Sequence, residues 1–170
     1  MKSSLNNTGS EVFRRNLLAA ALLTAFATPG VFAATITVVP TAPDSDGVVL
    51  DGQCSLREAV LSINAGQDVG DCVATDYGTN DTITLLAGTY NLTVTGLDES
   101  VSGSAPTYTV TNVPDATKGD LDITKSVRIV GAGADTTVIQ WDAAVLEADR
   151  DRIFHIFTPA VATVNVAIEG

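Results

Sequence analysis

Short segments of alternating apolar and polar residues recur along most of this chain, and each predicts a β-strand. Turns rich in Gly, Asp and Thr separate them, such as Gly131–Ala134. No long amphipathic helix lies between them, so a doubly wound α/β fold is not expected. The segments that we expect to form strands are residues 34–39, 82–86, 90–94, 120–123, 126–130, 137–141, 152–157 and 164–168.

One segment has the period of a helix instead. Residues 54–60 read CSLREAV, in which Ser55 is a good N-cap and Glu58 stands three residues later, the spacing of a capping box. Residues 64–66 end the pattern, so we expect a helix over 55–63 that is too short to be stable without packing. Its apolar stripe comprises Leu56, Ala59, Val60 and Ile63.

The first 33 residues have the pattern of a secretory signal peptide. Arg14 and Arg15 precede an apolar run over residues 16–27, and small residues near Ala33 suit signal peptidase. That run is too short for a membrane-spanning helix, and no later segment resembles one. We therefore expect an exported mature module over residues 34–170, in the periplasm, at the cell surface or outside the cell. The arginine pair leaves the export route open between the general and the twin-arginine pathway.

Charge narrows the range of partners. Removing the charged residues of the signal peptide leaves 6 basic and 19 acidic residues, a net charge of −13; those removed are Lys2, Glu11, Arg14 and Arg15. Such a surface repels phosphate backbones, so nucleic acid is not an expected partner. The mature chain also has two cysteines, and an even number in an exported protein predicts a Cys54–Cys72 disulfide.

The strand pattern alone leaves two architectures open, an antiparallel sandwich and a parallel β-helix. Tight hairpin signals are absent. Val138 and Val164 lie in similar apolar contexts at a spacing within the range of stacked coils, but one such pair does not establish a repeat.

A series of motifs over residues 48–170 resembles the CSLREA domain of exported bacterial proteins. The motifs are CSLREAV with Asn64 after it, DTITL at 81–85, GTY at 88–90, GDLDI at 119–123 and VGAG at 130–133. The resemblance implies an all-β fold, the start of a right-handed parallel β-helix of the pectin-lyase-like kind with a short N-terminal capping α-helix. It further implies that the disulfide-tethered helix is a lid over the first coil and that its residues are structural. Because the chain stops in a strand pattern, we expect it to be truncated before further coils of a longer protein.

Candidate chemistry is sparse. His155 is the one histidine, and we interpret it as a surface or turn histidine because spacing supplies no nucleophile or orienting acid. Asp44, Asp46 and Asp51 form an acidic turn that could bind Ca²⁺ without matching an EF-hand. Other acidic pairs, at 120 and 122 and at 149 and 151, are interpreted as turn residues in solvent. No other cofactor is expected.

The function that these observations favour is a non-catalytic exported module, the N-terminal cap of a cell-surface or adhesin-like protein. Glycans, surface proteins and the downstream coils of the same protein are the expected partners. The alternative is the N-terminal part of a polysaccharide-degrading β-helix enzyme, a lyase or hydrolase whose active site lies beyond residue 170. That alternative rests on fold analogy alone, and no catalytic residue is assigned in this chain.

Overall fold

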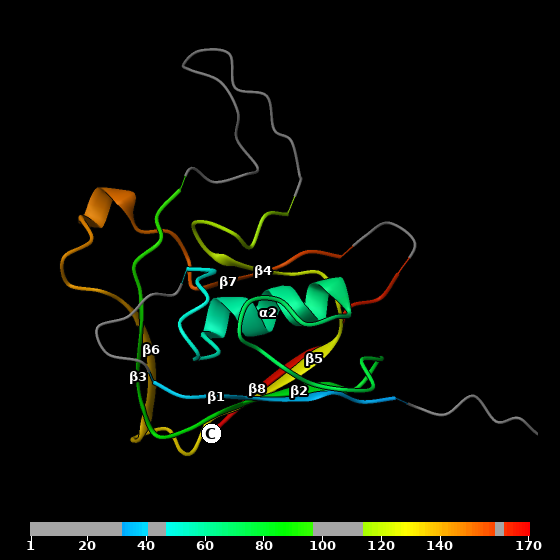
Figure 1. Ribbon diagram of the computed structural model, residues 1–170. Helices are drawn as coiled ribbons and strands as arrows, with labels where there is room; N and C mark the ends of the chain where they lie inside the picture. The colour runs from blue at the N-terminus through cyan, green and yellow to red at the C-terminus, as the bar shows by residue number, and fades with distance from the viewer. Residues whose placement is uncertain (1–31, 41–46, 97–113, 159–161) are drawn as a thin grey trace, which may run out of the picture. The chain divides into compact units, whose positions relative to one another are not determined.

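A computed structural model describes residues 32–40, 47–96, 114–158 and 162–170, and its strands pair exclusively in parallel within these ranges (Figure 1). Four strands form the largest sheet in the order β1-β2-β5-β8. Their bounds are Thr35–Val38 for β1, Asp81–Leu85 for β2, Val127–Val130 for β5 and Val166–Glu169 for β8. Each expected strand is present, with ends that lie within two residues of the predicted ones, as is usual for strand boundaries inferred from a pattern.

A ladder of isoleucines runs across this sheet. The parallel register aligns one isoleucine from each strand, namely Ile36, Ile83, Ile129 and Ile168. The first three are buried, whereas Ile168, on the edge strand β8, is 56% exposed. Side chains alternate between the two faces of a strand, so the polar residues between these isoleucines lie on the opposite face. The buried face of the sheet is therefore set by the period-two pattern of the sequence.

Two further sheets have two strands each. Strand β3 (Gly88–Leu92) pairs with β6 (Thr137–Trp141), and β4 (Leu121–Ile123) pairs with β7 (Phe154–Ile156). A short 3₁₀ turn, η1 (Glu147–Asp149), lies between β6 and β7. The Tyr90 hydroxyl on β3 lies 2.9 Å from the carbonyl oxygens of both Val38 and Leu86 and shares its one proton between them, which ties β3 to the end of β1 and to the turn after β2.

The helix α2 (Leu56–Ala65) begins after the predicted N-cap Ser55 and ends two residues beyond the predicted end at residue 63. Ser55 Oγ accepts from the Glu58 amide while the Glu58 carboxylate accepts from the Ser55 amide, so the capping box is confirmed. Gly66 ends the helix in the left-handed region, at φ 70°. The apolar stripe predicted from the sequence is buried, and α2 packs against β4, β1 and β2.

The predicted disulfide is confirmed. Cys54 and Cys72 are bonded with their Cα atoms 4.5 Å apart, which fastens the segment after α2 to the residue before the N-cap. Within this closed loop Gly70 has a φ of 62° and lies against the Glu58 carboxylate, where a Cβ atom would collide. The loop thus requires glycine at this position for both backbone conformation and space.

The expected fold class is wrong. Instead of an all-β chain that starts a right-handed parallel β-helix, the described residues form three separate small parallel sheets with one helix, and no β-helix is evident in them. Two of the sheets consist of a single pair of strands, and β4 and β7 have three residues each. Helix α2 also supplies four of the buried apolar side chains, so the core is shared between helix and strands. Alternating segments predict strands, but they do not determine how many strands a sheet contains.

The described residues belong to one compact unit, Val31–Gly170. Residues 1–31 of the expected signal peptide lie outside the described ranges. Within those ranges no helix combines the length and the apolar character that crossing a membrane requires. The longest described helix, α2, has ten residues, about half of what a bilayer span needs.

Candidate functional site

The pairing of β4 with β7 brings together two aspartates and the one histidine. The parallel register places Asp122 opposite His155, and Asp120 stands directly before β4. One ligand-type atom from each of these three side chains lies within 4.8 Å of the other two. Among the described residues, this acidic–histidine group, defined as Asp120, Asp122 and His155, is the one with a geometry that could hold a metal ion.

The two carboxylates of the group are buried, and the imidazole reaches solvent. The side chains of Asp120 and Asp122 are 0% and 1% exposed, whereas that of His155 is 31% exposed. His155 Nδ1 lies 2.6 Å from Asp122 Oδ1. Arg152 Nε lies 2.5 Å from Asp120 Oδ2. The group therefore has an inner, acidic side and an outer side formed by two basic residues.

Hydrogen bonding at this site is incomplete. Asp122 Oδ2 accepts from the Asp115 amide at 2.7 Å. Both carboxylate oxygens of Asp120, and Oδ1 of Asp122, are buried without a hydrogen bond. Two of these oxygens nevertheless have a close basic neighbour, since Asp120 Oδ2 forms an ion pair with Arg152 and Asp122 Oδ1 faces His155 Nδ1. Buried carboxylate oxygens without hydrogen bonds are rare and costly, so this set needs an explanation.

Burial also changes the pKa of Asp120. Desolvation, followed by repulsion from Asp122, raises the pKa of Asp120 to about 6, although the Arg152 cation opposes the shift. Removing a carboxylate from water disfavours its charged form, and a second carboxylate nearby adds to that effect. Asp120 therefore carries its charge near neutrality only at a cost that nearby cations reduce.

The backbone that carries the two aspartates is held from α2. Arg57 is fully buried and donates to the carbonyls of Ala116, Gly119 and Asp120, at 2.8, 2.7 and 3.3 Å. Asn64 donates through Nδ2 to the Asp122 carbonyl at 2.7 Å and accepts from the Thr124 amide at 2.9 Å. Both side chains point from the helix toward β4, so the disulfide-tethered helix fixes the position of the acidic residues.

The calcium candidates from the sequence are not part of this group. Asp44 and Asp46 lie outside the described residues. Asp51 is exposed, and its Oδ1 accepts from the Gln53 amide at 2.9 Å, which is an ordinary turn contact. The described part of the chain therefore assigns Asp51 to a turn and assembles a different set of possible metal ligands.

Sequence reasoning missed the acidic–histidine group. It interpreted Asp120 and Asp122 as solvated turn residues, whereas both are buried, and it interpreted His155 as a surface or turn histidine. The available signal was the Asp–Leu–Asp pattern at 120–122, which places both carboxylates on the same face of a strand. What remained hidden was the pairing partner, because nothing in the local pattern indicates that β7 lies beside β4.

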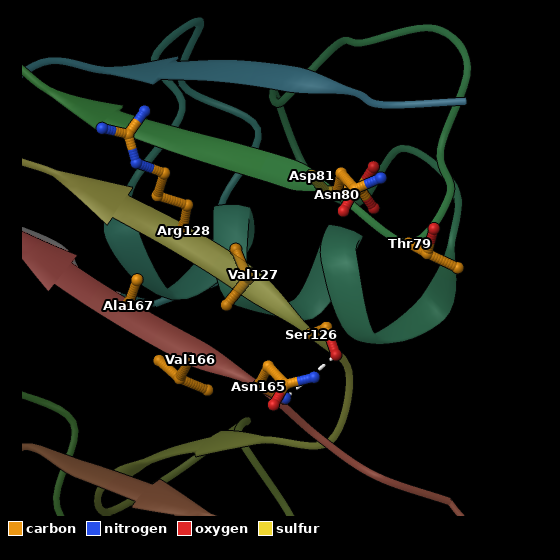
Figure 2. Close-up of a pocket in the computed structure, with 9 residues that line it drawn as sticks. All are labelled: Thr79, Asn80, Asp81, Ser126, Val127, Arg128, Asn165, Val166 and Ala167. Carbon is orange, nitrogen blue, oxygen red and sulfur yellow. Dashed lines mark hydrogen bonds between the residues drawn. The ribbon is translucent and has the colours of Figure 1, made fainter. Parts of the chain in front are cut away.

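A second feature is an open pocket of about 290 Å³ at the beginning of β2, β5 and β8 (Figure 2). The residues immediately before the three strands are polar, and the Asn165 amide donates to Ser126 Oγ at 3.0 Å. Asp81 Oδ1 accepts from the amides of Ala34 and Gly78, while its Oδ2 is buried without a hydrogen bond. The remaining lining residues are Thr79, Asn80, Val127, Arg128, Val166 and Ala167. Since Asp81 already serves to bind two backbone amides, we interpret its role as structural.

Comparison of the chain with protein families, with curated proteins and with solved structures found no match in any of the three.

Proposed function

We propose that this chain is a non-catalytic module of an exported cell-surface or adhesin-like protein. The observation that carries this proposal is the Cys54–Cys72 disulfide, which closes the loop around the capped helix. Structural disulfides persist in oxidising compartments and are rare in the cytosol. The signal-peptide pattern before residue 34 and the net charge of −11 for the whole chain agree with an exported, acidic surface.

The use of the buried polar residues supports a structural role for the helix. Arg57 and Glu58 could be imagined as an acid–base pair, but both side chains are fully buried and bind backbone groups. A general acid or base must reach the proton that it transfers. We therefore interpret CSLREAV as a structural element, as its resemblance to the CSLREA domain implies; membership of that family stays a prediction.

The experiment is export followed by an activity and binding screen. We expect the full chain, produced in a bacterial host, to leave the cytoplasm, to lose its signal peptide near Ala33 and to contain no free thiol. We expect it to leave uronate and neutral glycans chemically unchanged, and to be able to bind a glycan or a surface protein. A Cys54→Ser/Cys72→Ser variant is the control for disulfide-dependent export.

Two results would overturn the proposal. One is retention of the chain in the cytoplasm with both thiols free. The other is turnover of a glycan that disappears when one acidic residue is replaced by its amide, which would promote the alternative, part of a polysaccharide-degrading enzyme.

One observation favours an enzyme of a different form, in which carboxyls of this chain take part instead of an active site beyond residue 170. Asp120 and Asp122 are neighbouring carboxyls, and the raised pKa of Asp120, about 6, suits a general acid. Both carboxyls are buried, however, and a sugar cannot reach them without a rearrangement of β4 and β7. Asp120→Asn in the glycan assay separates the two functions. If Asp120 is structural or binds a metal, both the parent chain and the variant leave the glycans intact, whereas a catalytic Asp120 gives turnover that the variant lacks.

A further inference from the structure

We propose that the acidic–histidine group of Asp120, Asp122 and His155 binds one divalent transition-metal ion, of which Zn²⁺ is the expected physiological example. This site goes beyond the proposed module function, since that function does not require a metal. It also differs from the calcium site considered at residues 44, 46 and 51.

The donor set selects the class of metal. Two carboxylates and one imidazole offer oxygen and nitrogen ligands, a combination that suits Zn²⁺, Mn²⁺ or Co²⁺. Ca²⁺ and Mg²⁺ take oxygen ligands, so a histidine in the set disfavours both. The two cysteines are bonded to each other, so thiolates do not compete for the ion.

The unsatisfied oxygens are the second, independent observation. Asp120 is 0% exposed, and neither of its carboxylate oxygens has a hydrogen bond, although Arg152 lies beside Oδ2. Asp122 Oδ1, which faces His155, also lacks one. A bound dication offers these oxygens a partner of the charge they require, and it explains why two carboxylates are kept side by side out of water.

The dimensions of the group fit an ion after small side-chain movements. Metal–ligand distances of about 2.0–2.2 Å place neighbouring donors about 3.0–3.5 Å apart. The three donor atoms now lie within 4.8 Å of one another, and the pair formed by His155 and Asp122 is closer, at 2.6 Å. Binding therefore widens that pair and draws Asp120 inward. His155 must be neutral to bind the ion, so any proton on Nδ1 is released.

Neighbouring residues hold the side chains and the backbone of the proposed metal ligands in place. The Asp115 amide holds the second oxygen of Asp122, and Arg152 lies beside one oxygen of Asp120. Arg57 and Asn64 hold the backbone of the strand that carries both aspartates. Such outer contacts orient ligands and raise metal affinity. The exposed part of the His155 ring leaves the group a route to solvent.

The test uses the untagged full chain, stripped of metal with a chelator, and titrated with Zn²⁺ by calorimetry. We expect saturation at one ion per chain. His155→Gln should weaken Zn²⁺ binding at least about tenfold, the effect that even loss of an outer-shell partner produces. Asp149→Asn is the matched control, since Asp149 is an exposed acid in the nearby η1 that is not part of the group, and its Zn²⁺ affinity should equal that of the parent chain.

A measurement on the unchanged chain protects the test against misfolded variants. His155 is the one histidine of the sequence, so pulsed electron paramagnetic resonance of bound Cu²⁺ should show the remote imidazole nitrogen only if His155 is a ligand. Circular dichroism of each metal-free variant shows whether it has folded.

Absence of saturable Zn²⁺ binding by the parent chain overturns the proposal. So does Zn²⁺ affinity that is equal in folded His155→Gln and parent protein, or a Cu²⁺ spectrum without the imidazole nitrogen.

Discussion

Helix α2 and the acidic–histidine group both place charged side chains in the interior, but they treat them in opposite ways. Around the helix, Arg57 donates to three carbonyls and Glu58 accepts from backbone amides. In the acidic–histidine group, neither oxygen of Asp120 has a hydrogen bond, and the ion pair with Arg152 engages Oδ2. A buried charge with its bonds satisfied is part of the scaffold, whereas one left without them has a cost that a ligand can remove. The difference separates a structural role from a candidate binding role without reference to sequence relatives.

The largest effect is expected from removing the buried guanidinium. Arg57→Met should lower the free energy of unfolding by about 3 kcal/mol or more, because each buried carbonyl left without a donor costs about 1–3 kcal/mol. The carbonyls affected are those of Ala116, Gly119 and Asp120. Denaturant unfolding measures the change.

Arg128→Met is the control for that substitution. Arg128 is more than half exposed and pairs with Glu169 on the surface, so the same chemical change should have little effect there. Equal losses of unfolding free energy in the two variants would show that the buried hydrogen bonds of Arg57 contribute no more than a surface ion pair.

The second largest effect concerns the disulfide that tethers the helix. The bonded cysteines are 18 residues apart, and closing a loop of this length stabilises a protein by about 3 kcal/mol on the chain-entropy account. Reduction should therefore lower the free energy of unfolding by similar amounts in the metal-free and the Zn²⁺-loaded protein. A much smaller loss in the loaded protein would mean that the two regions are energetically coupled.

A change of opposite sign is expected at the acidic–histidine group. In metal-free protein at neutral pH, Asp120→Asn should raise the free energy of unfolding by about 1–2 kcal/mol, because it removes a buried charge that desolvation and repulsion from Asp122 disfavour more than Arg152 favours it. Arg152 can turn toward Asp151 or solvent when its partner is neutralised. With Zn²⁺ present the parent chain should become the more stable of the two. Destabilisation of the metal-free variant would place Asp120 in the same class as Arg57.

The smallest effect is expected at Tyr90, whose buried hydroxyl is hydrogen-bonded but uncharged. Tyr90→Phe should cost about 1 kcal/mol through the hydrogen bonds lost to Val38 and Leu86. Burial raises the pKa of Tyr90 from 10.0 to about 12. A raised pKa means that the folded state holds the proton more tightly, so this contribution is complete below pH 10 and is lost as the pH rises through 12.

Two alkaline measurements check the Tyr90 prediction. Tyrosinate absorbance should show Tyr90 ionising well above pH 10, and Tyr90→Phe should lose less stability than the parent chain over that range. Ionisation of Tyr90 at its ordinary pKa would mean that its hydroxyl is not held as the structure indicates.

Local features of this protein were accessible from the sequence, whereas pairings were not. Ser55 and Glu58 are three residues apart, and their capping box depends on nothing beyond one helical turn. The disulfide followed from an even number of cysteines in a chain that we expect to be exported. The strands followed from period-two alternation, but their division into three sheets did not. The expected β-helix came from the resemblance to the CSLREA domain and is wrong.

The acidic–histidine group depends entirely on distant pairing. Asp122 meets His155 only because β4 and β7 align, and a shift of register by one residue would turn His155 to the other face. The buried state of Arg57 likewise depends on carbonyls at 116–120, some sixty positions away along the chain. No window of sequence around either residue contains its partners.

The parallel pairing also has a consequence for the order in which the chain can fold. Thr35 pairs with Thr82 and Gly88 with Thr137, so each sheet joins segments separated by a long stretch of chain. Joining segments roughly 40 residues apart costs loop-closure entropy before the new contacts stabilise the chain. Folding is therefore expected to be slow, and the strand edges stay unpaired until the sheets form. The capping box and the disulfide of the helix, by contrast, join residues within one short stretch of chain, although the helix itself is packed against distant strands. Closure of the disulfide can therefore precede the pairing of distant strands, and Arg57 and Asn64 then provide the groups that hydrogen-bond the backbone of β4 when it joins the helix.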